Sequence, residues 1–154
     1  MNITIYIILR CGADPGIAHA WHLGMRRVLL HGTSEESFDH SVRFARRLVE
    51  AFGAELHVVY TVEEPLSAGW TAEMTPDRLP ELHQAIEEEA RERLARVLGD
   101  RAGEIVIAIR TGDAARELAR YTAENAVDLA IVQGADAHAR GMIEHGRCSV
   151  LLLR

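Results

Sequence analysis

Short β-branched segments alternate with segments of helical period from Met25 to the end of this chain, and this alternation constrains the fold more than any other feature. Five apolar runs show little polar alternation, as is typical of parallel strands covered on both faces: residues 28–30, 56–62, 104–110, 127–133 and 149–153. Parallel strands separated by helices are joined by right-handed crossovers. We therefore predict an α/β fold with an open, doubly wound, parallel five-stranded sheet and helices on both faces.

The first predicted helix has the clearest sequence pattern. Residues Thr33 to Glu36 match a capping box, in which the Thr33 hydroxyl and the Glu36 carboxylate satisfy free backbone amides. Apolar residues then recur at helical spacing as far as Gly53, which suits the left-handed residue that ends many helices. We expect this helix to begin at the capping box and to end before Gly53.

Two further helices are expected between later strands. The second covers about residues 80–98 and carries three Glu–Arg pairs four residues apart: Glu87/Arg91, Glu89/Arg93 and Glu92/Arg96. Pairs at this spacing stabilise exposed helix faces, so we expect all three to face solvent. The third helix covers residues 114–125, with Asp113 as its N-cap. Residues 63–79 are expected to form a connection whose tip reaches over one end of the sheet, and the sequence leaves open whether it acts as a lid.

Residues 1–24 do not share the alternating pattern. Their apolar run, residues 2–9, is followed by a stretch with glycine and proline and no periodicity. The run is shorter than the roughly 20 apolar residues that span a bilayer, and no basic residue precedes it as in a secretory signal. We predict a functional domain over residues 25–154, with residues 1–24 as an extension of doubtful structure or as sequence upstream of a true start at Met25.

Charge and cysteine content exclude several classes of function. The formal charge of −6 disfavours nucleic-acid binding, which needs clustered positive charge. All 17 basic residues are arginine, so lysine-dependent Schiff-base and P-loop chemistry is unavailable. The two cysteines, Cys11 and Cys148, lie far apart without metal-ligand spacing, which favours a reducing, cytoplasmic compartment.

Polar residues gather where the first, second and fourth predicted strands end. In open parallel sheets, ligands bind beyond the carboxyl ends of the strands, where the winding direction reverses. The candidate ligand-binding residues at these ends are His31, Gly32, Thr33, Ser34, Thr61, Val62, Gln133, Gly134 and Asp136. No catalytic residue is predicted, because no serine lies in a Gly-x-Ser-x-Gly elbow and Cys148 enters a buried strand.

Several motifs, in their order along the chain, resemble the universal stress protein family. They are HGTSEES at 31–37, AELHVVYTVEEP at 54–65, TGDAA at 111–115, VDLAIV at 127–132 and CSVLLL at 148–153. Together they cover nearly all of the chain after Met25. The resemblance implies an adenine nucleotide alpha hydrolase-like sheet of strand order 3-2-1-4-5, homodimers through the fifth strand, and a role in surviving stress.

The chain departs from the nucleotide-binding members of that family. Those members carry Gly-x2-Gly-x9-Gly-Ser/Thr after the fourth strand and an aspartate after the first. Here Gly134 matches the first glycine, Ala137 stands at the second, and most of the following helix is expected to be missing before Cys148. No acidic residue lies between Arg26 and Ser34. Because backbone amides at a helix start form the phosphate cradle, we expect no ATP binding.

These features favour a cytoplasmic, non-enzymatic stress-response protein without a cofactor, which acts as a homodimer or by binding a partner protein, and which binds neither nucleic acid nor membrane. The predicted dimer interface is the last strand: Val150, Leu151, Leu152 and Leu153. One alternative is an adenine-nucleotide sensor, for ATP or AMP, with a degenerate phosphate loop. A remote alternative is a metal site made of His31, Asp136 and His138, a pair of histidines with one carboxylate.

Overall fold

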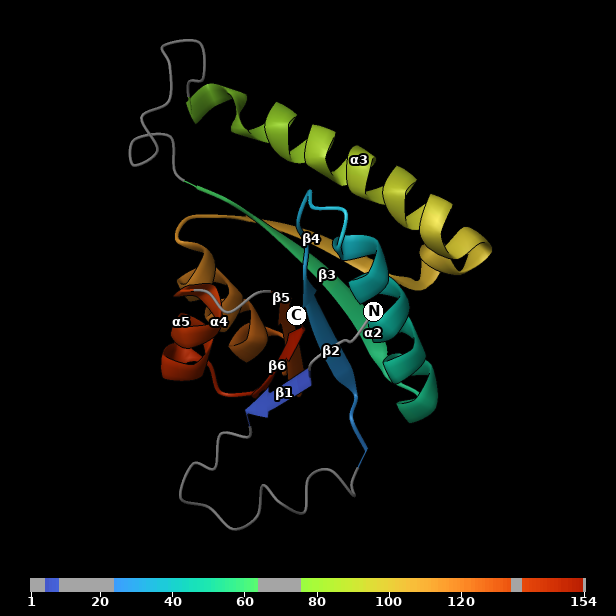
Figure 1. Ribbon diagram of the computed structural model, residues 1–154. Helices are drawn as coiled ribbons and strands as arrows, with labels where there is room; N and C mark the ends of the chain where they lie inside the picture. The colour runs from blue at the N-terminus through green and yellow to red at the C-terminus, as the bar shows by residue number, and fades with distance from the viewer. Residues whose placement is uncertain (1–4, 9–23, 64–75, 134–136, 154) are drawn as a thin grey trace.

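A computed structural model of the chain describes residues 5–8, 24–63, 76–133 and 137–153. Its centre is a six-stranded sheet of order β1-β6-β5-β2-β3-β4 (Figure 1). The strands are β1 Ile5–Ile8, β2 Arg27–His31, β3 Glu55–Val62, β4 Val106–Thr111, β5 Leu129–Gln133 and β6 Ser149–Leu153. The five strands β2 to β6 are parallel to one another, and in chain order they run 3-2-1-4-5 across the sheet. The predicted fold class is confirmed.

The sheet differs from the prediction at one edge, where it has a sixth strand. Strand β1 lies within residues 1–24, the segment predicted to be an extension of doubtful structure, and it pairs antiparallel with β6. The pairing joins Ile5 to Leu153 and Ile8 to Val150. A lone run of four apolar residues has no period that distinguishes a strand from an unstructured tail, so its place in the sheet cannot be predicted from local pattern.

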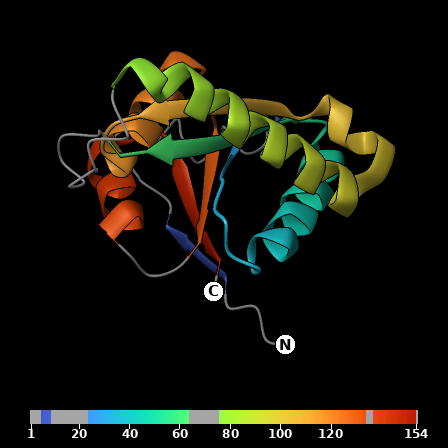
Figure 2. The same ribbon diagram turned by 90° about the horizontal axis from the view of Figure 1, so that it is seen from above.

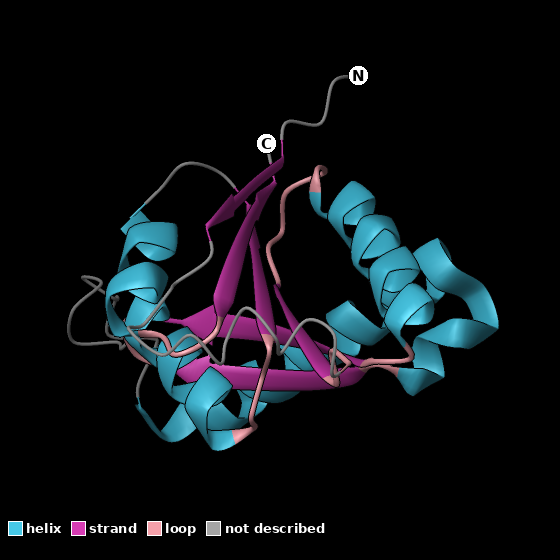
Figure 3. Ribbon diagram, turned by 90° about the horizontal axis from the view of Figure 1, so that it is seen from below, coloured by secondary structure: helices cyan, strands magenta, loops and turns pink. Residues whose placement is uncertain are grey.

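In the described part of the chain, four α-helices cover the two faces of the sheet. They are α2 Phe38–Phe52, α3 Leu79–Leu98, α4 Ala114–Glu124 and α5 Ala137–His145, and short 3-10 turns, η1 Pro76–Arg78 and η2 Gly99–Glu104, flank α3. Figures 2 and 3 show α2 and α3 on one side of the sheet and α4 and α5 on the other. Among the described residues, no helix is both long and apolar enough to cross a membrane.

Alternate residues of each central strand enter two separate hydrophobic cores, as the two-residue period of a strand requires. On β2, Val28 and Leu30 pack with α2 and α3, whereas Leu29 packs with α4 and α5. On β6, Leu151 and Leu153 join the first core and Val150 and Leu152 join the second. Cys148, predicted to be a core residue, is buried in the second core. This two-sided burial explains why the strands lack polar alternation.

The start of α2 corrects the predicted capping box. The helix begins at Phe38, with Ser37 at the N-cap position and no side-chain cap hydrogen bond, so residues 33–37 form a loop rather than the first helical turn. Its end is as predicted, because Gly53 adopts a left-handed conformation and its backbone N–H donates to the carbonyl of Val49. The loop before α2 therefore has hydroxyl groups available for contacts other than capping.

The other predicted helices agree closely with the structure, with one exception. Helix α4 has Asp113 as its N-cap, whose carboxylate accepts a hydrogen bond from the backbone N–H of Arg116 at 3.0 Å. The expectation that most of the helix after β5 is missing is wrong, since α5 has nine residues. Residues 64–75, most of the connection expected over residues 63–79, lie outside the described part of the chain.

Candidate functional site

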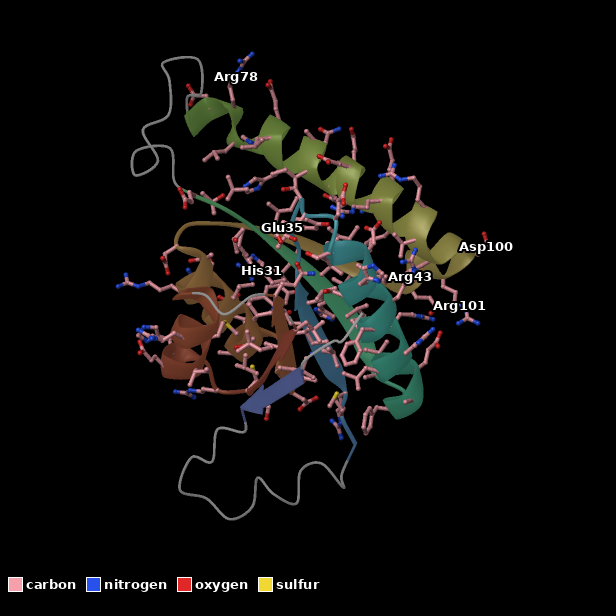
Figure 4. The ribbon with its side chains drawn as sticks, viewed as in Figure 1. His31, Glu35, Arg43, Arg78, Asp100 and Arg101 are labelled. Carbon is pink, nitrogen blue, oxygen red and sulfur yellow. The ribbon has the colours of Figure 1, made fainter. Side chains whose placement is uncertain are left out.

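A pocket of about 420 Å³ lies at the carboxyl ends of β2 and β3, under one side of α3. Its lining comes from three elements: His31, Gly32, Thr33, Ser34 and Glu35 after β2, Tyr60 and Thr61 on β3, and Ile86, Glu89, Ala90 and Arg93 on α3. Figure 4 labels His31 and Glu35, two of these lining residues, in the region between the end of β2 and α3. The volume falls in the range of about 300–1,000 Å³ that small ligands occupy in proteins.

The inner wall of the pocket depends on a close contact between Gly32 and Tyr60. A Cβ atom at position 32 would lie 2.6 Å from the Tyr60 ring, so only glycine leaves room for the ring in this position. The ring also meets Phe38 edge to face, with centroids 6.0 Å apart. Burial raises the pKa of Tyr60 to about 12, which keeps its hydroxyl protonated at neutral pH. Tyr60 therefore gives the pocket an aromatic surface with an uncharged polar group.

Arg93 fixes the outer wall by joining α3 to the loop after β2. Its Nε donates to the Asp39 carboxylate at 2.7 Å, and its two terminal nitrogens donate to the backbone carbonyls of Thr33 and Glu35. The guanidinium also lies over the Phe38 ring, 5.0 Å from its centroid. These contacts use the planar geometry of the guanidinium, which a lysine ammonium lacks. They hold the loop in the shape that closes the pocket.

A second set of hydrogen bonds ties the same loop to the end of β5. The Gln133 side-chain carbonyl accepts from the Thr33 hydroxyl at 3.2 Å and from the Ser37 hydroxyl at 3.4 Å, while its amide donates to Ser41. The hydroxyl of Thr33, predicted either to cap the helix or to bind a ligand, therefore donates its hydrogen bond to Gln133 at the end of β5. This cluster stabilises the meeting point of β2 and β5.

The structure brings together five of the nine predicted ligand-binding residues. His31, Gly32, Thr33, Ser34 and Thr61 line the pocket, and the His31 Nε2 lies 3.1 Å from the Thr61 hydroxyl. Gln133 reaches the pocket loop only through its hydrogen bonds, and Val62 does not line the pocket. Gly134 and Asp136 lie outside the described residues.

The pocket lining carries more acidic than basic side chains. It includes two carboxylates, Glu35 and Glu89, and one guanidinium, Arg93, which is already paired with Asp39. No group of three or more potential metal ligands occurs among the described residues. Of the predicted metal site, Asp136 and the side chain of His138 lie outside the described part, so only the His31 side chain is placed.

Sequence reasoning missed the part of the pocket that α3 supplies. The spacing of Glu89 and Arg93 predicts an exposed ion pair on that helix and gives no sign that its side chains line a pocket. In the structure Arg93 pairs with Asp39 instead, and only 16% of its side chain is exposed, so its predicted place on the solvated face is wrong. The Glu87–Arg91 pair is present as predicted. Arg93 and Asp39 lie far apart in the chain, so no pattern of local spacing predicts their contact.

A separate buried histidine lies on β3, facing α4. The His57 Nδ1 lies 2.8 Å from the Tyr121 hydroxyl, and its Nε2 is buried without a hydrogen-bond partner, 3.7 Å from the Glu55 carboxylate. Burial lowers the pKa of His57, and the nearby Glu55 carboxylate opposes this effect only in part. The imidazole is therefore neutral at physiological pH, and its hydrogen bond to Tyr121 joins the sheet to α4.

Comparison with known protein families now places this architecture. A family model described as "Universal stress protein family" matches residues 25–154, which is most of the chain. The chain belongs to the universal stress protein family. The matched region begins at Met25, where the predicted domain also begins, and it includes every described residue of the pocket.

Solved structures share the fold of this universal stress protein at low sequence identity. UspA from Lactobacillus plantarum is 18% identical, with 85% of this chain and 99% of that chain covered and a TM-score of 0.62. A universal stress protein in complex with cAMP is 16% identical, with coverage of 85% and 98% and a TM-score of 0.58. A universal stress protein from Archaeoglobus fulgidus in complex with dAMP is 13% identical, with coverage of 84% and 98% and a TM-score of 0.59. No curated protein matches the chain.

Proposed function

We propose that this universal stress protein is a non-enzymatic binding protein whose pocket takes an adenosine-like ligand with no phosphate or with one. The observation that carries the proposal is the pocket itself, because its volume suits a small molecule and its lining combines the Tyr60 ring and the apolar Ile86 with polar groups. Two proteins of the same fold have been solved with cAMP and dAMP, both of which are adenine nucleotides with a single phosphate.

The acidic lining favours a ligand of low negative charge. Glu35 and Glu89 face the space that a ligand would occupy, and the positive charge of Arg93 is largely used by Asp39. Each carboxylate near a bound phosphate costs about 1 kcal/mol or more in an aqueous environment, and more where the site excludes water. ATP, with several negative charges, is therefore disfavoured relative to adenosine or AMP.

Binding without turnover also agrees with how the polar groups in the pocket are used. The Thr33 hydroxyl donates to Gln133 and the His31 imidazole lies 3.1 Å from the Thr61 hydroxyl, so these groups join the ends of β2, β3 and β5. We thus propose a non-enzymatic protein, as expected from the sequence, that binds the adenosine part of a nucleotide. Unlike the nucleotide-sensor alternative, it has no loop dedicated to binding phosphates.

Titration calorimetry of the full-length protein with adenosine, AMP and ATP tests the proposal. We expect adenosine and AMP to bind, and ATP to bind at least tenfold more weakly than adenosine, a difference of about 1.4 kcal/mol. Replacing Glu89 by glutamine removes one lining charge without changing its size. We expect Glu89→Gln to strengthen ATP binding by about fivefold, because one repulsive charge is lost, while adenosine affinity stays within about twofold.

Glu88→Gln is the matched control, since Glu88 is exposed on the same helix, adjacent to Glu89, and does not line the pocket. It should leave all three affinities unchanged. Failure of all three ligands to bind the folded protein would overturn the proposed ligand class, and tightest binding of ATP would overturn the charge argument. ATP hydrolysis that disappears with Gly32→Ala would show that the pocket is catalytic.

A further inference from the structure

Strand β6 is apolar on both faces, and its outer edge is covered by the chain itself. Val150, Leu151, Leu152 and Leu153 are all buried, in alternation between the two cores. On one side β6 pairs with β5, and on the other it pairs with β1 over four successive residue positions (Figure 1). The edge of β6 that β1 covers is the one through which a homodimer is predicted to form.

An uncovered strand of this composition would add a further strand from another molecule. Edge strands present unpaired N–H and C=O groups, and a flat apolar edge is a template for pairing with a second chain. Strand β1 runs antiparallel to β6, which is also the direction that β6 of a second copy would take in a two-fold symmetric pair. The two arrangements use the same backbone groups of β6, so they exclude each other.

We propose that β1 is an intramolecular cap that competes with a second copy of this chain for the edge of β6. With β1 in place the protein is a monomer, and release of β1 allows two copies to pair through their β6 strands. The function of residues 5–8 is therefore to set the oligomeric state. This role is independent of what the pocket binds.

The chain connectivity gives β1 an advantage over a second copy. Ile8 pairs with Val150, near the start of β6, and this is the same edge of the sheet at which Arg27 begins β2. Ile8 and Arg27 therefore lie at the same end of the sheet, where the parallel strands begin. A tethered segment acts at an effective concentration on the order of millimolar. A second copy at micromolar concentration is then outcompeted by about a thousandfold, unless its pairing is correspondingly stronger.

A disulfide between β1 and β6 tests the pairing in the full-length chain. Ile8→Cys and Val150→Cys place two thiols at directly opposed positions, in a background where Cys11→Ser and Cys148→Ala remove the natural thiols. Opposed residues of an antiparallel pair have Cα atoms about 4.5–5.5 Å apart, within the range that a disulfide spans. We expect mild oxidation to give an intramolecular disulfide in a monomer. A failure of this disulfide to form would overturn the proposal.

Proline in β1 tests the consequence of the pairing. Successive N–H groups of a strand point to opposite sides, so the double substitution Tyr6→Pro and Ile7→Pro removes a donor toward β6 whichever of the two residues supplies it. The matched control, Tyr6→Val with Ile7→Val, keeps both donors and the β-propensity. By sedimentation, we expect the proline variant to dimerise with a dissociation constant at least about 100-fold below that of the control.

Each other outcome of that experiment contradicts the proposal. A folded proline variant that stays monomeric would show that the β6 edge does not pair with a second copy. A parent protein that is dimeric while its β1–β6 disulfide forms would show that β1 and the dimer interface do not compete. Loss of folding in the proline variant would also overturn the proposal, because a cap that can leave its edge must be dispensable for the rest of the fold.

Discussion

Removal of the Arg93 side chain should open the pocket loop and destabilise the protein. The guanidinium makes hydrogen bonds to Asp39 and to the backbone carbonyls of Thr33 and Glu35, and it stacks on Phe38. Arg93→Ala removes all of these contacts at once. Helix α2, which follows the loop, begins without a side-chain capping hydrogen bond, so the loop depends on contacts such as these.

The expected loss of stability can be worked out from these contacts. A hydrogen bond to a charged group contributes about 1.5–3 kcal/mol net, and a partly exposed cation–π contact about 0.5–1 kcal/mol. Asp39 and Glu35 are accessible to water, which replaces part of what is lost. We therefore expect Arg93→Ala to lower the free energy of unfolding by about 2–3 kcal/mol, which moves the urea midpoint by about 1–1.5 M at an m-value of about 2 kcal/mol/M.

Urea unfolding followed by circular dichroism measures this difference, and Arg91→Ala is the matched control. Arg91 lies two residues away on α3 and pairs with Glu87, but 66% of its side chain is exposed, so its loss should cost less than about 0.5 kcal/mol. Arg93→Lys keeps the charge without the planar fork and should fall between the two. If Arg93→Ala were no less stable than Arg91→Ala, the assignment of Arg93 as the anchor of the loop would be refuted.

Three further predictions test other parts of the structure. Gly32→Ala should lower the free energy of unfolding by about 1–3 kcal/mol in the same urea assay and abolish ligand binding, because its Cβ meets the Tyr60 ring at 2.6 Å. Gly103 has open space around it, so Gly103→Ala should change the free energy of unfolding little. The free energy of unfolding should fall as the pH drops below about 6.5, since the lowered pKa of His57 keeps the native imidazole neutral while the unfolded chain takes up a proton. This fall should be smaller in His57→Gln. An equal fall in the variant would contradict the assignment of His57 as a buried, neutral histidine. In a Cys11→Ser background, the Cys148 thiol should react with a thiol reagent at pH 8 only after denaturation, because burial raises its pKa, and rapid labelling of the native protein would be inconsistent with that burial.

The parallel part of the fold could be predicted because its determinants are local. Each of the strands β2 to β6 contains a run of three or more apolar residues, and the helices between them have periodic apolar stripes that end at recognisable residues such as Gly53. The added strand β1 could not be predicted in this way. Its place in the sheet depends on β6, which lies at the other end of the chain, and four apolar residues carry no information about a distant partner.

The candidate site divides along the same line. The strand ends His31–Ser34 and Thr61 follow from a general rule on where open parallel sheets bind ligands, and they do line the pocket. The wall formed by α3 does not follow from any rule of spacing. Arg93 matches the pattern of an exposed i,i+4 pair, and only the three-dimensional approach of the loop after β2 gives it a better partner in Asp39.

The central claim, that the pocket under α3 binds an adenosine-like ligand, is tested most directly by mapping the amide chemical shifts of the full-length protein during titration with adenosine. We expect saturable shifts at Gly32, Thr61 and Ala90, which line the pocket from the loop after β2, from β3 and from α3. We expect no comparable shifts at Leu151, because its strand β6 is separated from the pocket strand β2 by β5. Shifts confined to β6 and α5, or no shifts at saturating adenosine, would contradict this claim.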